Sequence, residues 1–281
     1  MKKVAVIGAG TMGNGIVQVC ATSGYQVTMI DVSEDFLKKG MSAIEFSLSR
    51  MIKKNKLSED QAKSILERIN PTLDYGFLKD VDIAIEAVPE ELDLKKRIFA
   101  KFDEFCSKDT IMGSNTSSLP ITAIATATER TDMVIGTHFI NPVPVMKGVE
   151  VIKGYLTSKQ TVDKTVEFIK SIGKIPGVVP DFPGFVATRI FNVYLNEAVK
   201  CVLLGVKPED VDNLMVHCSN VPIGPLKVID LIGLDVHLNV QNSLESELGD
   251  AYKVCPLTKQ MVRAGMLGVK SGKGFYDYEK T

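Results

Sequence analysis

Residues 2–31 read KKVAVIGAGTMGNGIVQVCATSGYQVTMID, and this stretch decides the fold. Residues 4–7 form a short apolar run of the kind that is buried on both faces of a parallel sheet. Gly8, Gly10 and Gly13 follow with the spacing G-x-G-x-x-G. The first glycine permits a tight turn, the second lets a pyrophosphate approach the backbone, and the third lets a helix pack closely on the strand. The pattern predicts a strand, a tight turn, a helix over about 11–23 and a second strand.

Asp31 ends the second predicted strand, eighteen residues after Gly13. An acidic side chain at this place accepts hydrogen bonds from the ribose hydroxyls and repels a 2′-phosphate. The first helical residues, Thr11 and Met12, present N–H groups and a positive dipole end to phosphates. Strand, helix and acid agree around the glycines, so we predict a dinucleotide site that favours NAD(H) over NADP(H). A glycine-rich turn without a ligand is the alternative.

The composition argues against several classes of protein. The chain has 281 residues, of which 45% are hydrophobic and 24% charged, enough for a large core and two domains. A net charge of −1 argues against a nucleic-acid binder, and no run of about 18 apolar residues predicts a membrane span. Five cysteines without paired spacing argue against a disulfide framework or a zinc site, and favour a reducing compartment such as the cytoplasm.

The rest of the chain predicts two domains of different class. Residues 34–70 have helical spacing and are too long for an ordinary crossover, so we expect an inserted helical hairpin. Buried strands are expected at 81–88, 109–115, 133–139, 149–154 and 174–181, and only helical segments beyond. The sequence therefore predicts an α/β domain over 1–183, with a doubly wound Rossmann-type sheet, and an all-helical C-terminal domain over 184–281. The apolar helix over 185–204 is either the centre of that domain or a subunit interface.

Polar side chains follow several of the predicted strands. Ligands of a doubly wound sheet lie beyond the carboxyl ends of its strands, which selects the loops holding Asn115, Ser117 and His138. An imidazole group titrates near neutrality, so His138 is suited to take a hydroxyl proton during oxidation and return it during reduction. Glu150, on the next strand, is placed to orient the ring. The alternatives are a structural histidine at a strand end and, for Ser117, a helix cap.

Six motifs run in order along almost the whole chain: VIGAGTMGNGI, EAVPEELDLKK, SNTSSL, HFINPVPVMKGVEV, DFPGF and KSGKGFYDY. Together they resemble the L-3-hydroxyacyl-CoA dehydrogenase family, and within it the bacterial 3-hydroxybutyryl-CoA dehydrogenases. The resemblance implies an NAD(H)-dependent enzyme that interconverts 3-hydroxybutyryl-CoA and acetoacetyl-CoA, and a homodimer formed by the helical domain. An NAD-dependent 3-dehydrogenase of a sugar acid such as L-gulonate, which PEELDLKK also resembles, is one alternative. A non-catalytic NAD-binding protein is another.

The resemblance also implies roles for individual residues. His138 is expected to be the catalytic acid/base, Glu150 its orienting partner, and Ser117 a hydrogen-bond partner of the 3-oxygen of the acyl group. Cofactor contacts are expected from Glu90, Lys95, Asn141 and Lys273, and substrate contacts from Asn141. The hairpin is expected to help bind the CoA part through Arg50 and Lys54, although a basic run of this kind also fits a solvated helix face.

One position departs from the family pattern. After PGF the family has two residues and then asparagine-arginine, whereas Thr188 stands here in place of the asparagine. Threonine has no amide but offers a hydroxyl group. We expect Thr188 to contact the acyl group through that hydroxyl, directly or through water.

Overall fold

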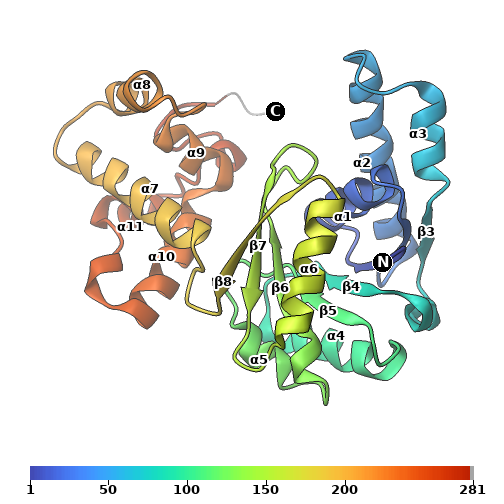
Figure 1. The fold of residues 1–281 in the computed structure, drawn as a ribbon. Helices are drawn as coiled ribbons and strands as arrows, with labels where there is room; N and C mark the ends of the chain where they lie inside the picture. The colour runs from blue at the N-terminus through green and yellow to red at the C-terminus, as the bar shows by residue number, and fades with distance from the viewer. Residues whose placement is uncertain (279–281) are drawn as a thin grey trace. The chain divides into compact units, whose positions relative to one another are not determined.

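The chain folds into two compact units, Met1–Phe185 and Val186–Thr281, in a computed structural model that describes residues 1–278 (Figure 1). The first unit combines strands with helices, and the described part of the second unit is helical. The predicted class, a doubly wound sheet followed by a helical domain, is confirmed.

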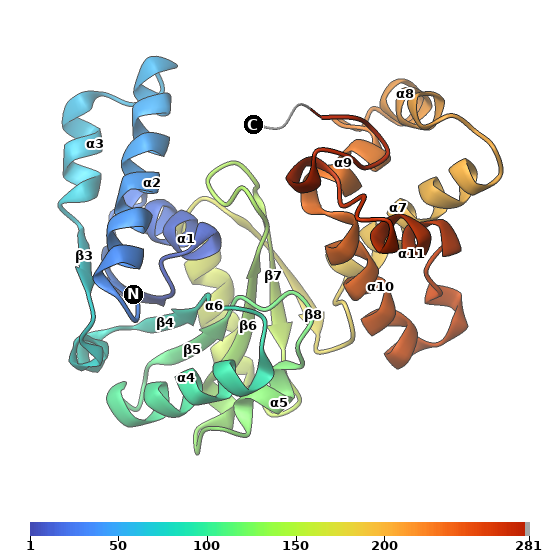
Figure 2. The same cartoon turned by 180° about the vertical axis from the view of Figure 1, so that it is seen from behind.

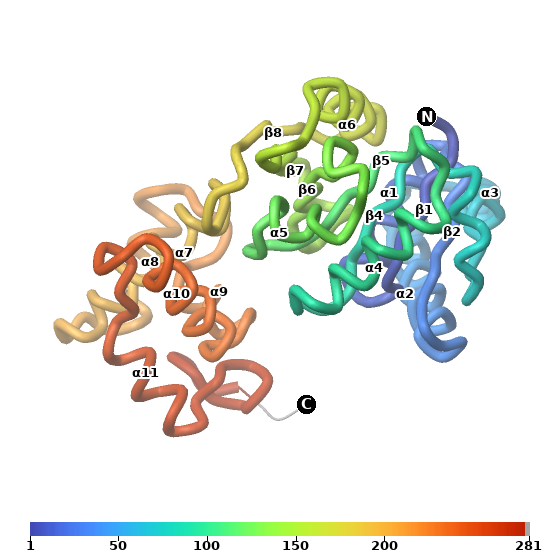
Figure 3. The backbone as a smooth tube through the Cα atoms, turned by 90° about the horizontal axis from the view of Figure 1, so that it is seen from below, coloured from blue at the N-terminus to red at the C-terminus, as the bar shows by residue number. Residues whose placement is uncertain are grey.

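One eight-stranded sheet forms the centre of the first unit, in the order β3-β2-β1-β4-β5-β6-β7-β8 (Figure 3). All neighbouring strands are parallel except β6 and β7, which are antiparallel. The strands are β1 (Lys3–Ile7), β2 (Gln26–Ile30), β3 (Ile69–Thr72), β4 (Ile83–Glu86), β5 (Ile111–Ser114), β6 (Val134–Phe139), β7 (Gly148–Lys153) and β8 (Ile175–Pro180). The carboxyl ends of β1, β2, β4, β5 and β6 therefore meet at one edge of the sheet.

Helices cover both faces of this sheet (Figures 1 and 2). One layer contains α1 (Thr11–Thr22), α2 (Glu34–Lys53), α3 (Glu59–Leu66) and α6 (Lys159–Ser171), and the other α4 (Leu92–Phe105) and α5 (Ile121–Ala125). Short 3₁₀ turns lie at Tyr75–Asp80 and Thr131–Met133. Side chains of β1 alternate between the layers: Val4 and Val6 pack in the core of α1 and α6, and Ala5 and Ile7 in the core of α4. A strand buried on both faces needs the continuous apolar run seen in the sequence.

The inserted hairpin consists of α2 and α3, which lie side by side. The Ser33 hydroxyl caps α2, and Ser58 and Gln61 form a capping box at the start of α3. Strand β3 follows directly and was not predicted. Its sequence is INPT, in which only Ile69 is buried, so it carries almost no apolar pattern. An edge strand tolerates Pro71, because one side of its backbone has no strand to pair with.

The second unit is built around one central helix. Its helices are α7 (Ala187–Leu203), α8 (Pro208–Ser219), α9 (Pro225–Ile232), α10 (Leu234–Leu248) and α11 (Pro256–Arg263), with 3₁₀ turns at Asp250–Tyr252 and Val269–Ser271. Helix α7 contacts the other four helices. Leu195 and Val199 of α7 pack with Leu226, Ile229 and Leu234 in its core. Over residues 1–278, no helix has the length and apolar character needed to cross a membrane.

Candidate active site

The glycine turn after β1 leaves room for a ligand at one glycine only. Gly8 has φ +105°, and a Cβ there would lie 2.6 Å from the carbonyl oxygen of Ala87. A Cβ at Gly13 would lie 1.7 Å from the carbonyl oxygen of Gly8, so both positions exclude any side chain. A Cβ at Gly10, in contrast, would meet no atom within 4 Å. Gly8 and Gly13 are required by the fold, whereas Gly10 leaves an open approach to the backbone.

The start of α1 and the end of β2 complete a surface that fits a dinucleotide. Helix α1 begins at Thr11 with no side chain capping its N-terminus, so its first N–H groups are available to phosphate oxygens. The two carboxylate oxygens of Asp31 accept hydrogen bonds from the N–H groups of Ala9 and Val32, each at 2.6 Å. These bonds fix the carboxylate beside the glycine turn, where it would meet the adenosine ribose of NAD(H).

His138 and Glu150 lie directly opposite each other on the antiparallel strands β6 and β7. Cross-strand pairs of this kind point to the same face of a sheet. Nδ1 of His138 lies 2.7 Å from Oε2 of Glu150, and the two residues are only 7% and 8% exposed. The carboxylate accepts from Nδ1–H, which leaves Nε2 as the ring atom suited to proton exchange. The structure thus brings together the two residues that the sequence paired.

The loop after β5 is tied to the strand that carries His138. Oδ1 of Asn115 accepts a hydrogen bond from the N–H of Phe139 at 2.9 Å. The N–H of Ser117 donates to Oε1 of Glu90 at 2.9 Å. Asn141 is exposed and lies three residues after His138, before Pro142, to which it is joined by a cis peptide bond. Asn115, Ser117, His138 and Asn141 therefore all belong to the carboxyl edge of the sheet.

A buried group of charges lies below this loop. The Lys95 ammonium group is 2.7 Å from Oε1 of Glu86 and 3.2 Å from Oε2 of Glu90, and Lys95 and Glu86 are 1% and 0% exposed. Burial raises the pKa of the Glu86 carboxyl, although Lys95 and three hydrogen bonds oppose the rise. Desolvation also acts on Glu90, but the Lys95 charge and hydrogen bonds from Thr116 and Ser117 hold the pKa of that carboxyl below its usual range.

The sequence gave no role to Glu86, although it carried a signal. A carboxylate inside the apolar strand pattern IAIEAV, at a strand end, needs a buried partner. Lys95 was predicted to contact the cofactor. Its ammonium group also donates to the carbonyl oxygen of Val88 at 3.2 Å, so three acceptors surround it.

The remaining predicted residues lie elsewhere in the chain. Arg50 and Lys54 are exposed at the end of α2. Thr188 lies in the first turn of α7, where its carbonyl oxygen accepts from Nδ2 of Asn192 at 2.9 Å. Lys273 is exposed, with its ammonium group 3.3 Å from Oδ1 of Asp277. Thr188 and Lys273 belong to the second unit and are described within it.

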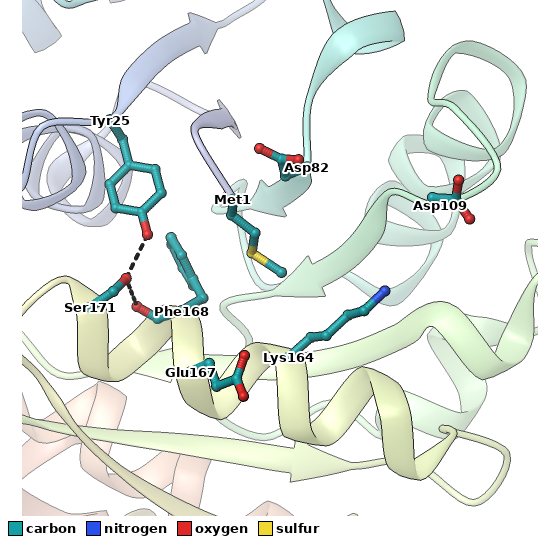
Figure 4. A pocket seen from close by; sticks show the side chains of 8 residues that line it. All are labelled: Met1, Tyr25, Asp82, Asp109, Lys164, Glu167, Phe168 and Ser171. Atoms are coloured by element: carbon teal, nitrogen blue, oxygen red, sulfur yellow. Dashed lines mark hydrogen bonds between the residues drawn. The ribbon is translucent and has the colours of Figure 1, made fainter.

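A cavity of about 430 Å³ lies at the opposite, amino-terminal edge of the sheet (Figure 4). Four of its lining residues, Met1, Tyr25, Asp82 and Asp109, precede strands β1, β2, β4 and β5. The Tyr25 hydroxyl lies 2.5 Å from that of Ser171 on α6. This cavity is therefore separate from the edge that carries His138. Within residues 1–278, no group of three or more His, Cys, Asp or Glu side chains is arranged to hold a metal ion.

Comparison with known proteins covers both units. Residues 3–182 match the family model "3-hydroxyacyl-CoA dehydrogenase, NAD binding domain". Residues 184–278 match "3-hydroxyacyl-CoA dehydrogenase, C-terminal domain". The first match shows that the first unit is an NAD-binding domain.

Individual relatives match over their full length. The chain is 47% identical over 280 residues to 3-hydroxybutyryl-CoA dehydrogenase of Clostridioides difficile, covering 99% of this chain and 100% of the relative. It is 45% identical to a probable 3-hydroxybutyryl-CoA dehydrogenase of Bacillus subtilis (strain 168), covering 100% and 98%. The crystal structure of (S)-3-hydroxybutyryl-CoA dehydrogenase from Ralstonia eutropha is similar, with a TM-score of 0.97 at 44% identity and full coverage of both chains. From both family models and these full-length relatives, this chain belongs to the 3-hydroxyacyl-CoA dehydrogenase family.

Proposed function

We propose that this chain interconverts 3-hydroxybutyryl-CoA and acetoacetyl-CoA with NAD(H), using His138 as the general acid and base. The observation that carries the proposal is the 2.7 Å contact between Nδ1 of His138 and Oε2 of Glu150. This contact lies at the edge of the sheet that also carries the open glycine turn and Asp31. The relatives described above bear the names of 3-hydroxybutyryl-CoA dehydrogenases, which supports this substrate.

His138 and Glu150 act as a pair. In the oxidation direction, Nε2 of His138 takes the proton of the 3-hydroxyl group, and in the reduction direction the imidazolium returns it to the 3-keto oxygen. The Glu150 carboxylate orients the ring and stabilises the imidazolium. NAD(H), when bound, supplies the hydride acceptor or donor.

Other residues bind and orient the two ligands. Backbone N–H groups at Thr11 and Met12 hold the pyrophosphate, Gly10 allows its approach, and Asp31 binds the ribose. Glu90, Lys95, Asn115, Asn141 and Lys273 are proposed to contact the cofactor. Ser117, with Asn141 and Thr188, is proposed to contact the acyl group. Arg50 and Lys54 are proposed to attract the phosphates of CoA, because both are exposed basic side chains at the end of α2.

We also propose that the chain works as a homodimer in the cytoplasm. Large apolar side chains are exposed on the second unit, among them Ile190 at 65%, Leu214 at 58% and Leu231 at 60%. Exposed apolar groups of this kind mark protein interfaces. All five cysteines are free, which fits a reducing compartment.

The test is a steady-state panel with acetoacetyl-CoA, longer 3-ketoacyl-CoAs and L-gulonate, each with NADH or NAD as the direction requires and followed by NADH absorbance. We expect turnover of acetoacetyl-CoA, a fall in kcat of roughly 10²- to 10⁴-fold for His138→Ala, and unchanged NADH binding. His217→Ala, which alters an exposed histidine of α8, is the matched control. Undiminished turnover by His138→Ala would contradict the proposed mechanism, and turnover of gulonate alone would contradict the proposed substrate.

A further inference from the structure

Glu86 is a fully buried carboxylate that the proposed mechanism does not use. It ends β4 at the carboxyl edge of the sheet, with Val88 and Ser114 beside it. A buried charge is unfavourable unless charged or hydrogen-bonding partners surround it. Its partners are the ammonium group of Lys95 at 2.7 Å, the N–H of Val88 at 2.7 Å and the hydroxyl of Ser114 at 2.7 Å. All hydrogen-bonding positions of this carboxylate are directed at the neighbouring loops.

Lys95 connects Glu86 to a second carboxylate. Its ammonium group lies between Oε1 of Glu86 and Oε2 of Glu90, at 2.7 Å and 3.2 Å. Glu90 has a side chain that is 36% exposed and is not enclosed by the core. The position of Glu90 therefore depends on the buried ammonium group, and the position of that group depends on Glu86.

The second carboxylate oxygen of Glu90 shapes the loop over 116–118. Oε1 of Glu90 accepts from the hydroxyl of Thr116 at 2.6 Å, the N–H of Ser117 at 2.9 Å and the N–H of Ser118 at 3.1 Å. The hydroxyl of Ser117 also lies 3.2 Å from this oxygen. Glu86 acts on the start of the same loop, since the hydroxyl that donates to it, that of Ser114, accepts from the N–H of Thr116 at 3.3 Å. Both carboxylates thus fix one five-residue loop.

We infer that Glu86 is a positioning residue, which holds Ser117 in place for catalysis through Lys95 and Glu90. The inference rests on the proposed function, in which Ser117 binds the 3-oxygen of the acyl group. Glu86→Gln keeps the size of the side chain and one acceptor oxygen, but removes the charge that holds the Lys95 ammonium group. The ammonium group then has only Glu90 as a counter-charge, and Glu90 shifts relative to the loop. A displacement of about 1 Å of a binding group lowers the rate by as much as about 10²-fold.

The test is a double-mutant cycle with Glu86→Gln and Ser117→Ala, using kcat for acetoacetyl-CoA reduction by NADH. We expect Glu86→Gln to lower kcat by about 10-fold in the wild-type background. In the Ser117→Ala background, we expect it to lower kcat by less than about two-fold, because the group it positions is already gone. Glu90→Gln retains an acceptor for Ser117 but loses its charge, and serves as a second variant on a partly exposed residue if Glu86→Gln does not fold. The same loss of effect in the Ser117→Ala background is expected for it.

Asp103→Asn is the matched control. Asp103 lies in the same helix, α4, and forms an ion pair with Arg130 at 2.8 Å, away from the loop. It is expected to lower the unfolding temperature with kcat unchanged, as any variant with a purely structural effect would. Equal fold losses of kcat from Glu86→Gln in both backgrounds would overturn this inference and leave the proposed function intact. A wild-type protein that turns over no acyl-CoA would overturn both.

Discussion

Asp31 shows how a single side chain is prepared for its ligand by the backbone around it. Each of its carboxylate oxygens already accepts one N–H, from Ala9 and from Val32. A carboxylate oxygen can accept more than one hydrogen bond, so capacity remains for ribose hydroxyls. The negative charge stays in one place and faces any 2′-phosphate that enters.

The charge at residue 31 is expected to decide between the two cofactors. Asp31→Asn keeps one acceptor oxygen and removes the charge, so both the charged hydrogen bond to the ribose and the repulsion of a 2′-phosphate are lost. We expect the ratio of kcat/KM for NADH to that for NADPH to fall by about 10- to 100-fold. Asp35→Asn, at an exposed position in the first turn of α2, controls for a general change of charge. An unchanged ratio for Asp31→Asn would show that the discrimination lies elsewhere.

Among the elements, the loop between β6 and β7 is fixed from several sides. Asn115 holds its first residue, Phe139. Its middle packs against α1, where a Cβ at Gly15 would lie 2.8 Å from Cβ of Val143. The ammonium group of Lys174, a residue only 8% exposed, donates to the carbonyl oxygens of Val143 and Met146. Burial lowers the pKa of this lysine. The loop that carries Asn141 is thus part of the rigid framework.

Lys174→Met is expected to loosen this loop, because two carbonyl groups lose their donor. Each carbonyl left unsatisfied costs about 1–3 kcal/mol, so we expect a lower midpoint of urea unfolding and a lower kcat/KM for acetoacetyl-CoA. Lys170→Met, at an exposed position of α6, is the matched control and should change neither quantity. If Lys174→Met has wild-type stability and wild-type kcat/KM, the ammonium group does not hold the loop.

For the molecule as a whole, stability depends on a buried polar group in the second unit. His237 of α10 is 0% exposed, and its Nδ1 lies 3.1 Å from Oδ1 of Asn192 on α7. Burial lowers the pKa of His237 from its ordinary value of 6.5 to about 4. The folded state therefore contains a neutral imidazole over a pH range in which the unfolded chain binds a proton.

The sign of the pH dependence follows from this difference. The unfolded state binds more protons between pH 6.5 and about 4, so the free energy of unfolding falls as the pH falls through this window. We expect His237 to contribute up to about 3 kcal/mol to that loss. His237→Gln should reduce the loss, whereas His217→Gln, at an exposed site, should leave it as in wild type. Urea unfolding followed by circular dichroism between pH 7 and about 4 measures it, and equal losses in wild type and His237→Gln would exclude His237 as the cause.

The sequence predicted those features that depend on local pattern. The β1 strand, the glycine turn and Asp31 follow one another within thirty residues, and each has a distinct physical requirement. Strand β3 could not be predicted, because its pairing with β2 at the sheet edge, and no apolar pattern of its own, makes it a strand. The pairing of His138 with Glu150 was predicted from their positions on successive strands. Their register, directly opposite each other, became visible only in the folded sheet.

Buried charges were the main feature that the sequence did not predict. Lys95 lies on an amphipathic helix and Lys174 in a turn, and lysines in both settings are usually exposed. Each is buried because acceptors from distant parts of the chain surround its ammonium group: Glu86 and Glu90 for one, Val143 and Met146 for the other. Such partners are set by tertiary packing, so local periodicity carries no information about them.

The most direct measurement of the proposed proton transfer is the single-turnover rate at which acetoacetyl-CoA oxidises bound NADH, compared between wild type and Glu150→Gln. Glutamine can still accept from Nδ1–H of His138 but does not stabilise an imidazolium. We predict a rate about 10- to 100-fold below wild type, with the dissociation constant of NADH unchanged. Glu167→Gln, at an exposed position of α6, should keep the wild-type rate. A Glu150→Gln rate within about two-fold of wild type would contradict a mechanism based on the His138–Glu150 pair.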